Sequence, residues 1–154
     1  MADIVIDEWL WADLSGSNTP KKQEEALKFL EAIFHVCDRI VTVEGKNFNL
    51  KASHFWKHTD PIRRGIAIYY RDNFLFNPVK IVKLEESSLD SIPEHISQKV
   101  KHEDDYYLIQ TYLTTGASVI VTTDSDMLKA DINNDINCQH RDEFLALYIR
   151  QHKD

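Results

Sequence analysis

The sequence contains few of the residues that mark unusual classes of protein. Four glycines and four prolines in 154 residues are too few for a collagen-like or low-complexity chain. No apolar run approaches the roughly 20 residues that a membrane-spanning helix needs, and the N-terminus has neither the basic start nor the apolar core of a signal peptide. With 43% apolar and 28% charged residues, the composition is typical of a globular protein. We therefore expect a single domain over residues 1–154, located in the cytoplasm and making no contact with a membrane.

Cysteine is also scarce. Cys37 and Cys138 stand alone and far apart, and the sequence has no Cys-x-x-Cys pair. This pattern predicts two buried, reduced thiols, which agrees with a cytoplasmic location. The seven histidines are scattered without the spacing of zinc ligands. The sequence therefore favours neither a disulfide nor a zinc site.

An excess of positive charge is missing as well. The formal net charge is −7, whereas nucleic-acid-binding proteins normally present a basic surface. A chain of this charge that binds RNA needs local basic patches or bound metal ions. Taken singly, each candidate cation is expected to be an ordinary solvated charge. The candidates for such patches are Lys21, Lys22, Arg63, Arg64, Lys80, Lys83, Lys99 and Lys101.

Short β-branched segments alternate with amphipathic ones along the chain. Strands are expected near residues 4–6, 78–84, 118–122 and 136–139, and residues 39–43 are expected to form a strand or an extended approach. Helices are expected near residues 20–37, 50–70 with an interruption at 60–61, 92 onward, 105–116, 127–130 and 142 onward. This alternation predicts an α/β fold, a three-layer α/β/α sandwich with a mostly parallel central sheet.

Carboxylates follow the predicted strands. Asp7 comes directly after the first strand, and Asp124 and Asp126 follow the strand that ends near Thr122. Asp105 opens the helix that leads into that strand. Because ligands of parallel sheets collect at the carboxyl ends of the strands, we expect these side chains to converge. Converging carboxylates repel one another unless a cation neutralises them, and Mg²⁺ or Mn²⁺ suits such oxygen ligands.

Each of these acids also has a purely structural explanation. Asp7, Asp105 and Asp124 each precede a plausible helix, where Asp is a good N-cap and complements the helix dipole. For any one of them alone, this explanation is the better one. It is their combination that indicates a metal site.

The segment from Asp105 to Leu128 resembles the PIN domain family. It contains an Asp that opens a helix, an apolar pair, Gly116-Ala117, an apolar strand, Thr-x-Asp and a further Asp. The first strand, ending at Asp7, matches the family's first acid. The resemblance implies that Asp7, Asp105, Asp124 and Asp126 are catalytic metal ligands for Mg²⁺ or Mn²⁺. It gives Thr122 a supporting role, orienting a carboxylate or bridging to phosphate.

The sequence departs from the family pattern in two places. Glu8-Trp9 follows the first acid, where the family has a small polar residue two positions on. The family's middle Glu has no clean counterpart: residues 49–53 lie where we would expect it, without an acid. Glu44 and Glu8 are the substitutes to consider, although Glu44 next to a glycine is better explained as a solvated turn residue. These departures leave the completeness of the metal site open.

Three functions are compatible with these residues. The first is a metal-dependent endoribonuclease of the PIN type. By family analogy, such an enzyme could be a toxin of the VapC kind with an antitoxin partner, or a processing or defence nuclease. The same analogy allows a homodimer. The second is a degenerate PIN-like module that binds RNA or a protein partner without cutting. The third, a phosphoacceptor switch, is disfavoured because no Lys follows the strand at 119–121 before Lys129.

Aromatic residues near the N-terminus allow two interpretations. Trp9 and Trp11 have the faces on which single-stranded bases stack. Their spacing also fits a packed helix or a subunit interface. The sequence favours packing over stacking.

Overall fold

A parallel β-sheet forms the centre of the molecule. The computed structural model describes residues 1–57 and 60–153, and within them five strands pair in the order β3-β2-β1-β4-β5, every pair parallel. The strands are β1 (Asp3–Ile6), β2 (Arg39–Val43), β3 (Ile81–Leu84), β4 (Val119–Thr122) and β5 (Cys138–His140). The predicted fold class is confirmed, and the sheet is parallel throughout these residues rather than mostly so.

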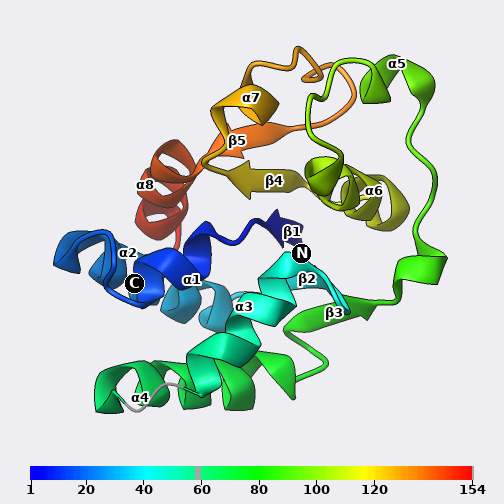
Figure 1. The fold of residues 1–154 in the computed structure, drawn as a ribbon. Coiled ribbons are helices and arrows are strands. Elements are labelled where there is room, and N and C mark those ends of the chain that lie inside the picture. Colours follow the sequence, from blue (N-terminus) through cyan, green and yellow to red (C-terminus); the bar gives the residue numbers. More distant parts are fainter. Residues whose placement is uncertain (58–59, 154) are drawn as a thin grey trace.

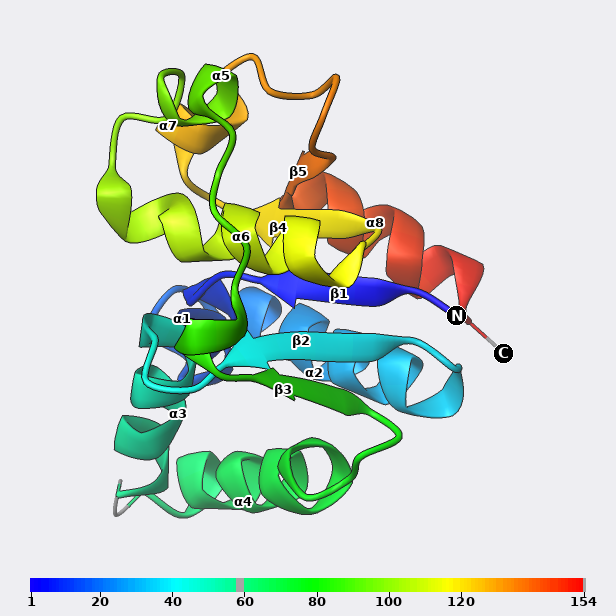
Figure 2. The same cartoon turned by 90° about the vertical axis from the view of Figure 1, so that its right-hand side faces the viewer.

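Helices cover both faces of the sheet (Figures 1 and 2). In chain order they are α1 (Trp9–Leu14), α2 (Pro20–His35), α3 (Asn47–Trp56), α4 (Pro61–Tyr70), α5 (Glu94–Ser97), α6 (Tyr106–Thr115), α7 (Ser125–Leu128) and α8 (Arg141–Gln151). One buried cluster joins α1, α2, α3, α4 and α8 to one face, and a second joins α5, α6 and α7 to the other. The arrangement is consistent with three layers.

Side chains of the strands alternate between these two clusters. Ile4 and Ile6 of β1 belong to the first cluster, whereas Val5 belongs to the second. In β4, Ile120 points to the second cluster and its neighbours Val119 and Val121 to the first. A strand that is buried on both faces has no polar face to present, which explains why these segments read as continuous apolar runs.

Local signals fix several helix ends. Thr19 caps α2 by accepting a hydrogen bond from the backbone N–H of Lys22, and Pro20 occupies the first helical position. Gly116 ends α6 with φ at 65°, a left-handed conformation that glycine adopts at little cost. Asp60 and Pro61 start α4 in the same way as Thr19 and Pro20 start α2.

Other expected boundaries are wrong by a few residues. The strand expected from residue 78 begins at Ile81, the strand expected over 136–139 is Cys138–His140, and the helix expected to reach residue 37 ends at His35. Of the segment 50–70, residues 58 and 59 lie outside the described residues. Strand and helix ends depend on tertiary pairing more than on local composition, so they are the least predictable part of an element.

The two thiols are less buried than expected. Both cysteines are free, but Cys37 is exposed and only Cys138 is partly buried, which raises the pKa of its thiol to about 11. The tryptophans behave as predicted for packing: Trp9 and Trp11 are 4% and 2% exposed. None of the helices in the described part of the chain has the length and apolarity to cross a membrane.

Candidate functional site

The strand order reverses between β1 and β4. From β1 the chain moves outward through β2 to β3, and β4 then returns to the other side of β1. Ile6 and Val121 are paired neighbours, so the residues after them leave the sheet at the same edge. This is the topological switch point, where parallel sheets form a crevice beyond the carboxyl ends of their strands.

Asp7 lies at this point and is held at both carboxylate oxygens. The backbone N–H of Glu8 donates to Oδ1 at 2.7 Å, and the Thr122 hydroxyl donates to Oδ2 at 3.0 Å. Burial raises the pKa of Asp7, while these two hydrogen bonds oppose the rise. The carboxylate therefore has a fixed orientation before any ligand arrives.

Thr122 also connects Asp7 to Asp124. Its Oγ1 accepts a hydrogen bond from the Asp124 backbone N–H at 3.1 Å. Asp124 in turn caps α7, accepting from the Asp126 N–H at 2.9 Å. The expected contact between Thr122 and a carboxylate is thus present. Asp124 combines the capping role with a position beside the other acids.

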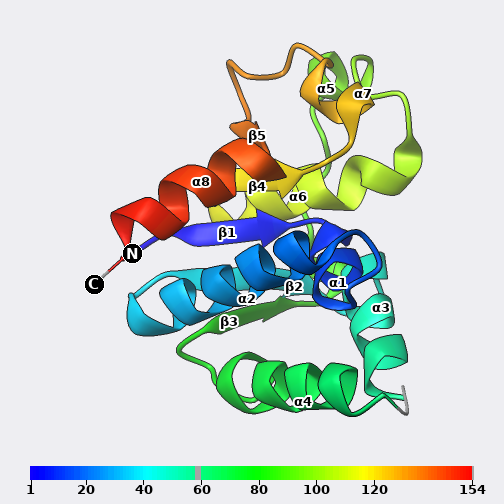
Figure 3. The same ribbon diagram turned by 90° about the vertical axis from the view of Figure 1, so that its left-hand side faces the viewer.

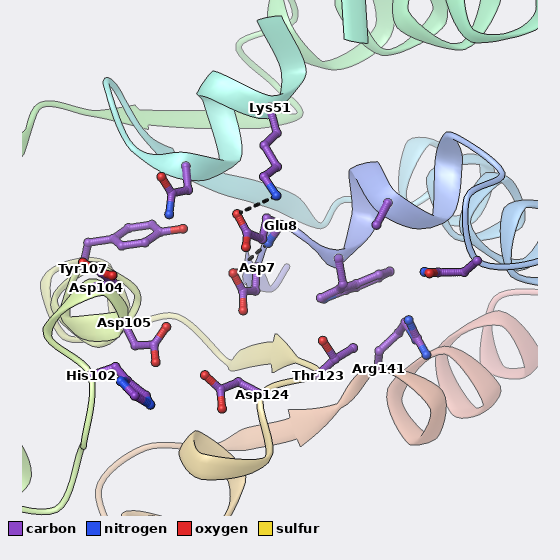
Figure 4. Close-up of a pocket in the computed structure, with 14 residues that line it drawn as sticks. Asp7, Glu8, Lys51, His102, Asp104, Asp105, Tyr107, Thr123, Asp124 and Arg141 are labelled. Atoms are coloured by element: carbon purple, nitrogen blue, oxygen red, sulfur yellow. Dashed lines mark hydrogen bonds and ion pairs between the residues drawn. The ribbon is translucent and has the colours of Figure 1, made fainter. Parts of the chain in front are cut away.

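Asp105 reaches the same place from α6. It precedes the helix but its side chain makes no capping hydrogen bond, so helix capping does not account for its position. Figure 4 shows the Asp7, Asp105 and Asp124 side chains around a common space. Burial raises the pKa of Asp105 to about 7, helped by a hydrogen bond with Asp124 and by the charges of Asp124 and Asp7. Burial and the neighbouring carboxylates both disfavour the charged form, so the cluster favours the binding of a proton or a cation.

These three acids line a cavity of about 530 Å³. Its wall is formed by side chains from both sides of the switch point. They are Asp7, Glu8, Trp9, Ala12, Asn18, Asn47, Lys51, His102, Asp104, Asp105, Tyr107, Thr123, Asp124 and Arg141.

Two of the candidate metal ligands lie outside this wall. The side chain of Asp126 contacts the wall through His102. Its carboxylate pairs with the His102 ring at 3.2 Å and with Lys101 at 3.6 Å, and these partners lower its pKa. Glu44 is exposed in the turn after β2. The structure therefore does not bring Asp126 and Glu44 together with the other three acids.

Lys51 occupies the region where a middle acid was expected. It lies on α3, and its ammonium group is 3.4 Å from the Glu8 carboxylate (Figure 4). Glu8 lines the cavity but is engaged with this lysine, so its carboxylate is partly neutralised. The side chains of Lys51 and Glu8 are 55% and 38% exposed, which leaves the pair open to an incoming ligand.

Tyr107, close to Asp105 in the sequence, also lines the cavity. It lies in the first turn of α6 and is 9% exposed. Its buried hydroxyl has no hydrogen-bond partner of normal geometry, and Figure 4 shows it directed toward the acidic centre. Burial raises its pKa, and the charges of Asp7, Glu8 and Asp105 add to the effect. A buried donor without a partner is costly, so this hydroxyl is available to a bound ligand.

The donor chemistry suits a hard divalent cation, but a closed binding site is not preformed. Among residues 1–57 and 60–153, no three His, Cys, Asp or Glu side chains are arranged to hold a metal ion between them. The carboxylates of Asp7, Asp105 and Asp124 supply the oxygen donors that Mg²⁺ and Mn²⁺ prefer, and the His102 ring lies beside Asp105 and Asp124. Binding would therefore require the side chains to draw closer, or water to complete the coordination.

The raised pKa of Asp105 predicts a specific dependence of stability on pH. The native protein holds a proton here that the unfolded chain has already released, so the contribution of Asp105 to stability falls as pH rises from about 4 to about 7 and then levels off. Thermal unfolding with chelator present should show this fall in the wild type and a flatter profile in Asp105→Asn. Parallel profiles would show that Asp105 titrates normally. Asp105 is partly exposed, so solvent screening limits the size of the effect.

Similarity to known proteins adds nothing to this description of the site. Comparison of the chain with protein-family models, curated proteins and solved structures found no match.

Proposed function

We propose that this protein is a divalent-metal-dependent endoribonuclease with a PIN-like active site. The convergence of Asp7, Asp105 and Asp124 at the switch point carries the proposal. A raised pKa in a crevice, caused by burial and by neighbouring carboxylates, is typical of functional sites. Phosphodiester hydrolysis is the chemistry that such a cluster supports when it binds divalent ions.

Asp105 and Asp124 would hold the ion, with Asp7 beside them. The bound metal would lower the pKa of water and offset charge on the phosphate. Thr122 and the Glu8 backbone N–H fix the orientation of Asp7, so that part of the site needs no rearrangement. Outer contacts of this kind commonly contribute about 10–100-fold in metal affinity or activity.

Cationic groups at the cavity have different roles. Lys51 is exposed and can exchange its contact with Glu8 for a phosphate oxygen. Arg141 instead holds the fully buried Asp13, at 3.2 Å, and lies over the Trp9 ring. Lys51 is thus the cation that is free to contact substrate, whereas Arg141 stabilises the wall of the cavity.

The choice of RNA over other phosphodiesters follows from the PIN resemblance. The same analogy supplies the narrower possibilities: a toxin with an antitoxin partner, a processing or defence nuclease, and a homodimer. None of the contacts at the cavity distinguishes among them. The proposal therefore names the reaction and the residues, with RNA as the first substrate to test.

A second candidate is a PIN-like module that binds RNA or a protein without cutting it. Two observations favour it. Lys51 stands where the family pattern has an acid, and the described side chains do not form a closed metal site. A site that fails to bind metal would retain the cavity and its cations but lose the hydrolytic chemistry.

Metal titration separates the two candidates. We expect the wild type to bind Mn²⁺ in isothermal titration calorimetry, and Asp124→Asn to raise the Kd at least about tenfold because a ligand is lost. Asp126→Asn should change the Kd less, since Asp126 lies outside the cavity wall. Asp135→Asn, at an exposed pair with His95, serves as the distant control. Mn²⁺ binding that is absent from the wild type, or equal in all four proteins, would favour the non-catalytic module.

A further inference from the structure

Helices α2 and α8 run side by side in the same direction. Lys22 near the start of α2 pairs with Asp142 near the start of α8. Farther along, the Phe29 ring packs against Phe144 and Tyr148, with centroids 5.8 and 5.4 Å apart. Figure 3 shows the two helices neighbouring each other on one face of the sheet. Both helices therefore begin at the sheet edge that carries the acidic cavity.

A groove follows the seam between these helices. It consists of two hollows of about 490 and 340 Å³ that share Lys28, Ile149 and Lys153 in their walls. Leu145, Ala146 and Ile149 of α8 give it apolar surface. The length of α8, about 16 Å by helix rise, is several times the roughly 3.4 Å rise per nucleotide of a helical strand.

Positive charge is concentrated on this groove. The larger hollow is lined by five cations, Lys21, Lys22, Lys28, Arg150 and Lys153, and by two acids, Glu25 and Asp142. Its formal charge of +3 contrasts with −7 for the whole chain, so the rest of the chain carries −10. Such segregation provides the local basic surface that nucleic-acid binding requires in an acidic protein.

Several of these cations are available. Lys21, Arg150 and Lys153 are exposed, and none of them forms an ion pair with another part of the chain that the structure describes. The N-termini of α2 and α8 add the positive ends of two helix dipoles at the end of the groove nearest the cavity. An anionic chain would therefore meet unneutralised charge along the groove.

The groove begins beside the acidic cavity. Arg141 belongs to the cavity wall, and the next residue, Asp142, belongs to the groove. The Arg141 guanidinium contacts both Asp13 below the cavity and Asp142, at 3.2 and 3.0 Å. A polymer with one phosphodiester in the cavity could thus continue directly between α2 and α8.

We propose that the α2–α8 groove binds the sugar–phosphate backbone of single-stranded RNA that flanks the scissile phosphodiester. This inference rests on the proposed function. Continuity with the cavity favours RNA over an acidic protein segment, which the apolar floor would also accept.

Binding can be measured without cutting. Fluorescence anisotropy of a labelled single-stranded RNA, in chelator and over a range of salt, would compare the wild type with the triple variant Lys21→Gln, Arg150→Gln, Lys153→Gln. We expect about a tenfold or greater loss of affinity at low salt, and a salt slope lower by about 2, since each phosphate contact on a single strand contributes about 0.7. The matched control is Lys57→Gln, Lys83→Gln, Lys129→Gln, three exposed lysines outside the groove, and it should bind like the wild type.

Three results would overturn the groove assignment. They are unchanged affinity in the groove variant, an equal loss in the control variant, and binding of an acidic apolar peptide with no RNA binding. Because the anisotropy is recorded in chelator, it does not depend on catalysis. A wild type that binds RNA through the groove but never cuts it would reject the nuclease proposal and keep the groove.

Discussion

Asp105→Asn and Asp124→Asn are each expected to reduce metal-dependent cutting of RNA by at least about two to three orders of magnitude. Both substitutions preserve shape and remove one charge from the cluster at the switch point. Outer contacts to metal sites are commonly worth about 10–100-fold, so a direct ligand should be worth more. Cleavage of labelled structured and single-stranded RNAs with Mn²⁺, with Mg²⁺ and with chelator would measure the loss.

The thermal stability of the metal-free Asp105→Asn variant provides a second test of the same site. In chelator, Asp105→Asn should unfold at a higher temperature than the wild type near neutral pH, because it removes a partly buried carboxylate that Asp124 and Asp7 repel. Lower activity combined with higher metal-free stability cannot be explained by misfolding. It is the pattern expected of a strained functional site.

Two further variants calibrate the result. Thr122→Val keeps the volume of a fully buried side chain but removes the hydroxyl that donates to Asp7, so an intermediate loss of about 10–100-fold is expected. Asp126→Asn should have the weakest effect of the set. Equal activity in the wild type, Asp105→Asn and Asp124→Asn would indicate a contaminating nuclease and contradict the proposed site.

The sequence predicts the fold well because its strands are buried on both faces. Ile4 to Ile6 and Val119 to Val121 have no polar face, and this pattern belongs to a parallel sheet between helical layers. The direction and order of the strands, however, come from tertiary pairing. The same limit applies to Cys37: its exposure depends on where α2 ends, and that end lies two residues earlier than expected.

Asp7 and Asp124 could be anticipated because strand ends share an edge of the sheet, and Asp105 because it opens the helix that leads into β4. The place of Lys51 in the cavity could not, since it projects from a helix whose orientation is set by long-range packing. Asp126 lies outside the cavity wall for a local reason. It follows the N-cap Asp124 by two positions, and its carboxylate pairs with His102, which does line the cavity.

Of the basic residues that the sequence offers for binding RNA, some lie on a basic surface and others do not. Lys21 and Lys22 do line a basic surface together with Lys28 of α2, but Arg150 and Lys153 join it from more than a hundred residues later in the chain. Lys80 is only 6% exposed, and its ammonium group donates to the Ile33 and Val36 carbonyls at the end of α2. This lysine stabilises a helix C-terminus, where a positive charge is favourable, and does not belong to a nucleic-acid-binding surface.

Trp11→Ala is expected to destabilise the fold by about 3–5 kcal/mol, the usual cost of removing a buried aromatic side chain. The Trp11 ring lies 5.5 Å from Phe48, 5.5 Å from Phe55 and 4.8 Å from Tyr70, between centroids. These contacts join α1 to α3 and α4. Denaturant unfolding monitored by circular dichroism would measure the loss.

A conservative variant distinguishes lost packing from lost hydrogen bonding. The Trp11 indole N–H is buried without a partner, so Trp11→Phe removes an unsatisfied donor while keeping most of the ring, and it should cost much less than Trp11→Ala. Trp9 provides the contrast, because its indole N–H donates to the Val121 carbonyl at 2.9 Å. If Trp11→Ala kept wild-type stability and lost RNA affinity instead, the ring would be a base-stacking platform. Its burial among three aromatic rings argues for the opposite result, and it makes α1 the rigid support on which Asp7 and Glu8 are held.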